Sequence, residues 1–216
     1  MKPHIPSQTP KQAKLIRLII IFNLVGMLGF AIPALQHVFM LLVPWHLLLM
    51  GIFIIISHER FDERFLFFFI LTYTLTFFAE WVGVHTNFFF GNYHYGHTMG
   101  QKLWDIPLVI GITWFLLIYC AGVLMQWSRI KNMFFRVIIG SVTLVLLDLL
   151  IEPVAMRFDY WHWSGGIVPM KNYLGWFMVS IVMLFVFELF KFKKQSLVAV
   201  VLLGMQFVFF GALCLI

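Results

Sequence analysis

Charged residues are scarce in this chain of 216 residues: Asp, Glu, Lys and Arg together make up 11%, whereas 62% of the residues are hydrophobic. An average soluble domain is about a quarter charged and about half apolar, so the composition excludes a soluble globular protein. Cysteine is scarce as well. Cys120 and Cys214 both lie in apolar runs, where a thiol behaves as a small hydrophobic group, and we predict no disulfide framework.

Several catalytic motifs are also missing. The sequence has no glycine-rich phosphate loop, no G-x-S-x-G elbow and no H-E-x-x-H pair, which argues against nucleotide-dependent enzymes, serine hydrolases and zincin-type enzymes. We expect no nucleic-acid partner although the net charge is +6. The basic residues flank apolar segments instead, where they indicate membrane topology and contacts with membrane lipids.

Long apolar runs predict an all-α, polytopic transmembrane bundle. One crossing needs about 20 apolar residues. Seven runs fit, near residues 15–35, 38–57, 65–84, 104–126, 134–152, 173–190 and 196–216. We therefore expect residues 1–216 to form a single transmembrane domain, with an N-terminal tail at 1–14 and two long loops at about 85–103 and 153–172.

Basic residues predict the orientation of this bundle. Three of them, Lys102, Arg157 and Lys171, fall on one side, and twelve fall on the other. By the positive-inside rule the N-terminus is cytoplasmic and the C-terminus lies outside, so we expect a multi-pass protein of the cell (inner) membrane. The twelve are Lys2, Lys11, Lys14, Arg17, Arg60, Arg64, Arg129, Lys131, Arg136, Lys191, Lys193 and Lys194.

Acidic residues gather at the predicted outer end, where the two longest loops also lie. Loops of more than about 12–15 residues in a compact protein usually carry function. Five of the nine acidic residues, Glu80, Asp105, Asp148, Glu152 and Asp159, are close to this end. The outer half of the bundle is therefore the expected site.

Three of these acids lie inside predicted helices, and intramembrane acids are candidates for function. Asp148 and Glu152 are four residues apart on one helix face, so like-charge repulsion in a low dielectric favours one protonated carboxyl beside an ionised one. Such a pair can donate a proton to an uncharged substrate and accept another. The structural alternatives are interhelical hydrogen bonds for Glu80 and Asp148, and a helix-end acid before Pro153 for Glu152.

Asp105 and Asp159 complete the candidate acids, and each has a structural alternative. Asp105 precedes Ile106-Pro107, where it can cap the N-terminus of a helix. Asp159 lies close to Arg157, with which it can form a surface ion pair.

Two similar segments follow Glu80 and Glu152. The first contains Tyr93-His94-Tyr95 and the second Trp161-His162-Trp163, and each is followed by a proline and another helix. This pattern indicates a weak internal repeat. Because both parent helices are predicted to run outward, the two copies would have parallel topology.

Aromatic residues, 19% of the chain, crowd the outer loops. An interfacial belt accounts for part of them, and the others can wall a hydrophobic slot and stabilise a carbocation through their ring faces. The outer-face histidines leave a zinc site as a competing interpretation. These are His85, His94, His97 and His162. We favour a site without a metal.

These segments resemble the integral-membrane carotenoid biosynthesis proteins that include the bisanhydrobacterioruberin and γ-carotene 1,2-hydratases. The resemblance covers about residues 80–176 in order and spacing, whereas the first two helices and the last are similar only in being apolar. It rests on residues 80–86, 90–95, 104–107, Trp114, 148–155, 158–163, 167–169 and 172–176.

This resemblance implies addition of water to the terminal 1,2 double bond of an acyclic, lycopene-like or γ-carotene-like end group, with no cofactor. Protonation at C2 would leave a tertiary cation at C1, which water attacks. We expect Asp148 and Glu152, with Glu80 across the bundle, to supply acid and base, and keep Asp105 and Asp159 as catalytic candidates. The expected substrate-binding residues are Trp81, Asn87, Tyr93, Tyr95, Trp114, Trp161, Trp163, Asn172 and Trp176.

Two other functions stay open. A lycopene-cyclase-like enzyme would close a ring on the same cation, and a non-enzymatic transporter or carotenoid-binding protein would also contain buried acids. Asn87, Asn92 and Asn172 near the acids favour access of water and therefore hydration. Other enzymes of the carotenoid pathway are expected partners besides the substrate and lipids.

Overall fold

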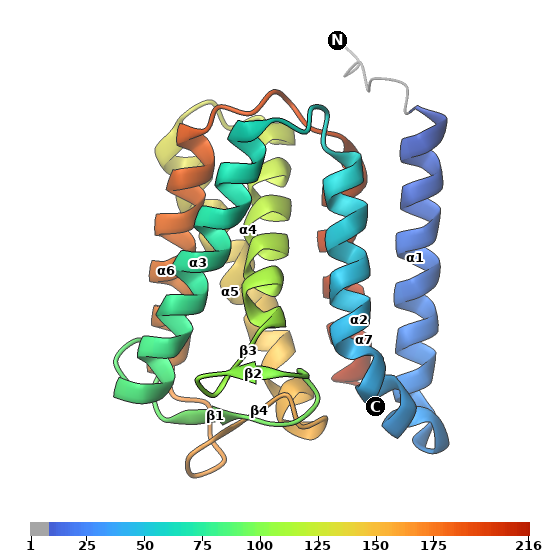
Figure 1. Ribbon diagram of the computed structural model, residues 1–216, viewed down its shortest axis with the longest axis vertical. Helices are drawn as coiled ribbons and strands as arrows, with labels where there is room; N and C mark the ends of the chain where they lie inside the picture. The colour runs from blue at the N-terminus through green and yellow to red at the C-terminus, as the bar shows by residue number, and fades with distance from the viewer. Residues whose placement is uncertain (1–8) are drawn as a thin grey trace.

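The computed structural model describes residues 9–216, and these form seven α-helices and four short β-strands (Figure 1). Six helices are long and apolar enough to cross a membrane, and α7 is shorter at 17 residues. The predicted seven-helix transmembrane bundle is therefore confirmed. The helices are α1 (Pro10–Ala31), α2 (Pro33–Ser57), α3 (Glu63–Thr86), α4 (Val109–Trp127), α5 (Met133–Arg157), α6 (Met170–Leu189) and α7 (Leu197–Leu213).

The strands all lie at one end of the bundle (Figure 1). They are β1 (Tyr93–Tyr95), β2 (Lys102–Leu103), β3 (Ile106–Pro107) and β4 (Trp161–Trp163). Helix α1 begins at the opposite end and α7 ends at the strand-bearing end, as an odd number of crossings requires. We call the strand-bearing end the outer end, following the orientation that the basic residues predict.

Proline explains why the first two helices differ from their predicted ranges. The break falls at Ile32, which is extended with φ −96° and ψ 110°, and α2 begins at Pro33. Proline disfavours helical backbone in the residue before it and suits the first turn of a new helix. Helix α1 also starts earlier than residue 15, because Thr9 caps it by accepting from the backbone N–H of Gln12. Residues 1–8 of the predicted tail, including Lys2, lie outside the described residues.

Helices α4 and α5 also differ from the sequence prediction. Residues 104–108 are not helical, because β2 and β3 form a hairpin whose turn residues Trp104 and Asp105 have positive φ values of 51° and 66°. The N-cap role considered for Asp105 is therefore wrong, and α4 begins at Val109. Helix α5 continues past Pro153 to Arg157, since transmembrane helices tolerate an interior proline.

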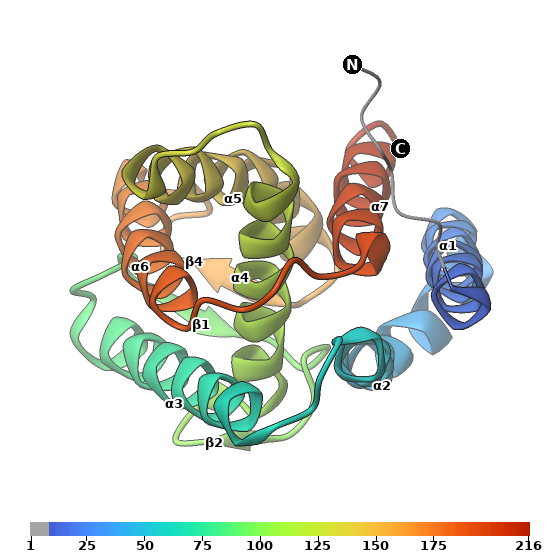
Figure 2. The same cartoon turned by 90° about the horizontal axis from the view of Figure 1, so that it is seen from above.

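Helix α4 lies at the centre of the bundle (Figure 2). It lies between α3, α5 and α6 on one side and α1, α2 and α7 on the other, and α5 also contacts α7 directly. Its membrane-spanning window is 78% buried, against 22–44% for the other five long helices. A helix that is apolar all round suits this central position, and it contributes side chains to both halves of the molecule.

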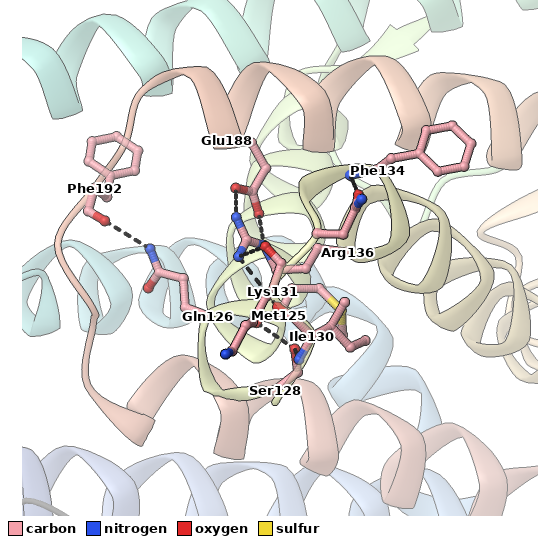
Figure 3. Close-up of polar contacts among 10 residues, drawn as sticks. Met125, Gln126, Ser128, Ile130, Lys131, Phe134, Arg136, Glu188 and Phe192 are labelled. Atoms are coloured by element: carbon pink, nitrogen blue, oxygen red, sulfur yellow. Dashed lines mark hydrogen bonds and ion pairs between the residues drawn. The ribbon is translucent and has the colours of Figure 1, made fainter.

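The inner end of the bundle is held together by polar contacts (Figure 3). Arg136 of α5 forms a two-pronged ion pair with Glu188 of α6, with Nε–Oε1 and Nη2–Oε2 distances of 2.8 and 2.5 Å. Gln126 of α4 donates to the carbonyl of Phe192 over 3.1 Å. Bidentate Arg–carboxylate pairs are among the stronger side-chain contacts, so α4, α5 and α6 are fixed at this end independently of the outer end.

We expect Glu188→Gln to lower the free energy of unfolding by about 1–3 kcal/mol, because a hydrogen bond to a charged group contributes about that much. Thermal unfolding in detergent micelles measures this loss. Glu59→Gln, in the exposed loop after α2, is the control and should unfold like the wild type. Equal losses in the two variants would contradict the assignment.

Candidate active site

The two aromatic–His–aromatic segments pair with each other at the outer end. Strands β1 and β4 run antiparallel, with His94 opposite His162 at the centre. Successive residues of a strand point to opposite faces, so the histidines are the more exposed positions and the flanking rings are buried. These rings belong to Tyr93, Tyr95, Trp161 and Trp163. The pairing therefore directs two tyrosine hydroxyls and two indole N–H groups into the bundle.

Glu80 of α3 accepts three hydrogen bonds. The hydroxyls of Tyr93 and Tyr95 donate to its Oε2 over 2.5 and 2.7 Å, and the indole N–H of Trp114 on α4 donates to its Oε1 over 2.7 Å. The side chain is buried. Both carboxylate oxygens therefore have donors. The bond from Trp114 links α3 to α4, and it is the interhelical hydrogen bond that the sequence analysis considered as a structural role for Glu80.

The two tyrosines in β1 remain donors over the physiological pH range. Burial, and then the negative charge of Glu80, raise the pKa of the Tyr93 and Tyr95 hydroxyls well above the usual value. Both hydroxyls therefore keep their protons, and Glu80 remains supplied with donors.

Glu152 of α5 has a matching set of donors. The indole N–H groups of Trp161 and Trp163 donate to its Oε2 over 3.0 and 2.7 Å. The amide of Asn172 on α6 donates to Oε1 of Glu152 and to Oδ2 of Asp148, each over 2.8 Å. The remaining oxygen of Asp148, Oδ1, is buried and has no hydrogen-bond partner in the protein within residues 9–216.

The repeat predicted from the sequence relates these two sets of contacts. Helices α3 and α5 run in the same direction (Figure 1), and each is followed by a strand whose two aromatic residues bind that helix's glutamate. Seven residues after the prolines Pro107 and Pro169 come Trp114 and Trp176. Their rings lie 4.5 Å apart at 34°. The two halves thus meet about an approximate two-fold axis along the bundle.

The halves differ where the chemistry is expected. Four residues before Glu152 is Asp148, whereas the corresponding residue before Glu80 is Thr76. Three residues after Pro169 is Asn172, whereas Ile110 follows Pro107 at the same spacing. Only the α5–α6 half therefore carries a second carboxyl and an amide that binds both acids.

A cavity of about 340 Å³ lies between α1, α2, α4 and α7 and reaches Trp114 and Trp161, which bind Glu80 and Glu152. This volume is in the range of small-molecule pockets. Three of its lining residues belong to the site just described: Trp114, Trp161 and Trp176. Most of the other lining residues are apolar, and they include Trp45, so the cavity suits a hydrophobic ligand that lies against four indole rings.

One wall of the cavity is continuous with the lipid-facing surface. Phe22 and Val25 of α1 line it while 40% and 49% exposed, and Leu42 and Trp45 of α2 line it while 46% and 69% exposed. In a bilayer these residues would contact acyl chains. A lipid-soluble molecule can therefore reach the cavity between α1 and α2 without crossing an aqueous phase.

Residues 18–216 match a protein family described as carotenoid biosynthesis protein. The chain belongs to this family. A curated relative, the bisanhydrobacterioruberin hydratase of Haloarcula japonica, is 29% identical over 125 residues, which cover 55% of this chain and 42% of the relative. The match thus spans less than half of that hydratase. No solved structure matches the chain.

Six of the nine residues predicted to bind substrate in this carotenoid biosynthesis protein donate hydrogen bonds to carboxyl oxygens, and their role in substrate binding stays a prediction. They are Tyr93, Tyr95, Trp114, Trp161, Trp163 and Asn172. Trp176 stacks on Trp114 and lines the cavity. Trp81 and Asn87 lie apart from the cluster: Trp81 lines a separate surface groove, and Asn87 ends α3 with a left-handed backbone.

Two of the five predicted catalytic acids are not part of the buried cluster. Asp105 lies in the β2–β3 turn with its side chain 80% exposed, 3.5 Å from Nε2 of His85. Asp159 accepts hydrogen bonds at the outer surface from the backbone N–H of His97 over 2.8 Å and from the ring of His162 over 2.7 Å. Arg157, its expected partner, instead donates to the carbonyl of Leu213.

Sequence reasoning missed the residues that α1, α2 and α7 contribute to the cavity. Asn23, His46 and Gln206 all line it, and the amide of Gln206 donates to Oδ1 of Asn23 over 3.2 Å. Each has only apolar neighbours in its stretch of helix, and that isolation was the available signal. Their helices matched the family resemblance only in hydropathy, so no motif pointed to them.

The pKa of Asp159 gives a pH prediction. Partial burial acts to raise it, but the hydrogen bonds from His162 and His97 outweigh burial and hold the pKa below its usual value. Such a carboxyl stabilises the fold above its unfolded-state pKa of about 3.9, and this contribution is lost as the pH falls through the lower folded-state value. Because the side chain is partly exposed, we expect a loss of less than about 1 kcal/mol.

Thermal unfolding at neutral and strongly acidic pH checks this prediction. Asp159→Asn should lose less stability on acidification than the wild type, whereas Asp105→Asn should behave as the wild type does. An unchanged acid sensitivity in Asp159→Asn would show that the Asp159 contacts do not stabilise the outer sheet.

Proposed function

We propose that the protein is a carotenoid hydratase that adds water to the terminal 1,2 double bond of an acyclic carotenoid end group. The observation that carries this proposal is the buried carboxyl pair Asp148 and Glu152, bridged by Asn172 and placed behind the indole wall of an apolar cavity. Family membership supports a carotenoid as the substrate class, and the name of the Haloarcula japonica relative supports hydration.

Hydrogen-bond donors distinguish the roles of the three acids. Glu80 and Glu152 each accept three N–H or O–H donors, an arrangement that suits ionised carboxylates, which only accept. Asp148 accepts one donor, from an amide that it shares with Glu152. Asp148 is therefore the carboxyl that carries a proton and acts as general acid, and Glu152 is the base.

The reaction follows from these roles. Asp148 transfers its proton to C2 of the end group, and the two π-electrons form the new C–H bond, leaving a tertiary cation at C1. Water adds to C1 and loses a proton to Glu152, which returns it to Asp148. One water is consumed, and the product is a tertiary alcohol.

The surrounding groups stabilise the cation and hold the acids. The indole faces of Trp114, Trp161 and Trp176 wall the cavity, and a cation over a desolvated aromatic face gains about 2 kcal/mol or more. The negative charge of Glu80 adds a long-range contribution in the low dielectric of the bundle. Asn172 is the positioning residue, since one nitrogen binds both members of the acid–base pair.

The alkene can reach Asp148 only when the indole wall opens. Among residues 9–216, the cavity is lined by three of the indoles and not by the three carboxyls. Trp114 and Trp161 are held by hydrogen bonds to glutamates. Trp176 makes no hydrogen bond through its indole within the described chain, so its ring can turn without breaking one.

The test is expression in a lycopene-accumulating bacterial host, with mass-resolved chromatography of the pigments. We expect a more polar product that is heavier by one water. General acid catalysis contributes about 100-fold or more, so Asp148→Asn and Glu152→Gln should reduce the hydrated product at least about 100-fold. Asp105→Asn, which changes an exposed acid, is the matched control.

Other outcomes would identify the alternatives. A product of unchanged mass would indicate ring closure on the same cation and therefore a cyclase. Unaltered pigment in the presence of folded protein in the membrane would contradict hydration of this end group. Equal pigment turnover in Asp148→Asn and the wild type would indicate that these carboxyls are structural.

A second prediction concerns the indole wall. We expect Trp114→Phe to reduce hydration about tenfold, because it removes a hydrogen bond to Glu80, and about 1.4 kcal/mol corresponds to a factor of ten. Trp176→Phe keeps an aromatic face and removes no hydrogen bond, so it should cost less. Initial rates of product formation compare the two, and a larger loss in Trp176→Phe would contradict the role given to the hydrogen bond between Trp114 and Glu80.

A further inference from the structure

The cavity between α1, α2, α4 and α7 has a polar side that the proposed chemistry does not use. Asn23 of α1, His46 of α2 and Gln206 of α7 line it among mostly apolar residues. The hydrocarbon core of a bilayer supplies no water to polar groups, and the cavity opens toward lipid at Phe22 and Trp45. Each polar group on this side therefore needs a partner from the protein or from a ligand.

Asn23 is satisfied by the protein itself, and its side chain is buried. The amide nitrogen donates to the carbonyl of Ile19 over 2.8 Å and to Sδ of Met50 over 3.8 Å, and Oδ1 accepts from Nε2 of Gln206 over 3.2 Å. A backbone carbonyl only accepts, so the nitrogen of Asn23 has to face Ile19. The oxygen of Asn23 therefore faces Gln206, and it is the nitrogen of Gln206 that donates.

Gln206 is left with a free acceptor. Its nitrogen is bound to Asn23, so the carbonyl oxygen Oε1 occupies the other branch of the planar amide, and it accepts no hydrogen bond within residues 9–216. The fully enclosed side-chain oxygens that lack a partner in this part of the chain belong to Thr72, Asp148 and Ser180. Oε1 of Gln206 is not one of them, so it borders open space. The spaces that Gln206 lines are this cavity and a much smaller one beside it.

This acceptor lies near the indole wall. Gln206 and Thr113 line the smaller cavity together, and Thr113 directly precedes Trp114 in α4. Gln206 and Trp114 also both line the larger cavity. A ligand that fills the larger cavity therefore contacts an indole ring and the amide at the same time.

His46 is a second polar group of the cavity, and it is less well oriented. It lies four residues before Met50, the residue that Asn23 contacts, and therefore about 6 Å farther outward along α2. No hydrogen bond within the described chain fixes its ring. A group that is already oriented loses less entropy when a ligand binds, so the amide of Gln206 is the better-prepared partner.

We propose that Gln206, oriented by Asn23, is a hydroxyl-binding subsite that makes the cavity selective for lipid-soluble alcohols. A carbonyl oxygen only accepts, so its partner has to donate a hydrogen bond. A hydroxyl group can do so, whereas an ether, a ketone or a hydrocarbon cannot. The apolar lining and the opening toward lipid suit the remainder of such a molecule.

The inference rests on the proposed function for its role and not for its existence. Under that function, the bound group is the tertiary hydroxyl that addition of water creates. The alkene has no donor at this position, so the subsite favours the product over the substrate. Hydrated pigment should therefore compete with its precursor for the cavity.

Isothermal titration calorimetry of the full-length protein in lipid nanodiscs tests the subsite without turnover. The probes are tetrahydromyrcenol, a small isoprenoid with a tertiary hydroxyl, and its methyl ether, which keeps the oxygen but cannot donate. Empty nanodiscs correct for partitioning of each probe into lipid. We expect the wild type to bind the alcohol about fivefold more tightly than the ether, the effect of one ordinary hydrogen bond.

Variants of the amide pair should abolish or weaken this preference. Gln206→Leu should bind the alcohol and the ether equally, and Gln206→Met, which keeps a long side chain without the amide, should do the same. Asn23→Ala should weaken the preference, because Gln206 loses the contact that orients it. An unchanged affinity for the ether shows in each case that the cavity is intact.

Thr113→Val is the matched control. It removes a hydroxyl that lines the same cavity but donates to the carbonyl of Val109 over 3.2 Å, so the wild-type preference should remain. Equal binding of alcohol and ether by the wild type, or a preference that survives in both Gln206 variants, would overturn the subsite. A preference lost in His46→Leu and kept in Gln206→Leu would place hydroxyl binding at His46 and contradict the assignment.

Pigment analysis in the lycopene-accumulating host separates failure of the subsite from failure of the function. A preference for the alcohol with no hydrated pigment would leave the subsite standing and reject hydration. Hydrated pigment with no preference for the alcohol would reject the subsite and leave hydration standing.

Discussion

The need to satisfy buried carboxylates in a lipid environment governs this structure. Water is absent from the hydrocarbon core, so every charged or polar group there requires a partner within the protein. Glu80 and Glu152 together accept six hydrogen bonds. The donors come from β1, β4, α4 and α6, which explains why two short strands fold back into the end of a helical bundle.

The α3–α4 and α5–α6 halves are related by an approximate two-fold axis, so the residues in which they differ are informative. In both halves a buried glutamate accepts hydrogen bonds from the polar groups of two aromatic residues, and these bonds stabilise its negative charge. Only the α5–α6 half adds Asp148 and Asn172, and this half also contains the one carboxyl oxygen of the cluster, within the described residues, that lacks a partner. A group that is not needed to satisfy the fold is free for chemistry, so the departure from symmetry supports the proposal that the α5–α6 half is the reactive side.

The remaining helices explain how a hydrophobic substrate can meet this chemistry. Helices α1, α2 and α7 pack against the far side of α4 and leave an apolar cavity that is open to lipid. Their side chains carry no acid into the site. Under the proposed function the protein therefore separates two tasks along α4: one side would admit an apolar substrate from the bilayer, and the other holds the acids away from lipid.

Hydropathy alone determined the seven crossings, because about 20 apolar residues in a row have few stable alternatives to a membrane helix. The sequence also indicated that Glu80, Asp148 and Glu152 lie inside the bundle, since acids within apolar helices are conspicuous. It indicated as well that the aromatic residues of the two outer segments gather near them. Only the tertiary structure showed that Tyr93 and Trp163 pair across two strands and bind different glutamates, that Asp105 and Asp159 lie outside the cluster, and that Asn23, His46 and Gln206 line the cavity. Those facts depend on strand register and helix packing, which bring together residues far apart in the chain and leave no local pattern in it.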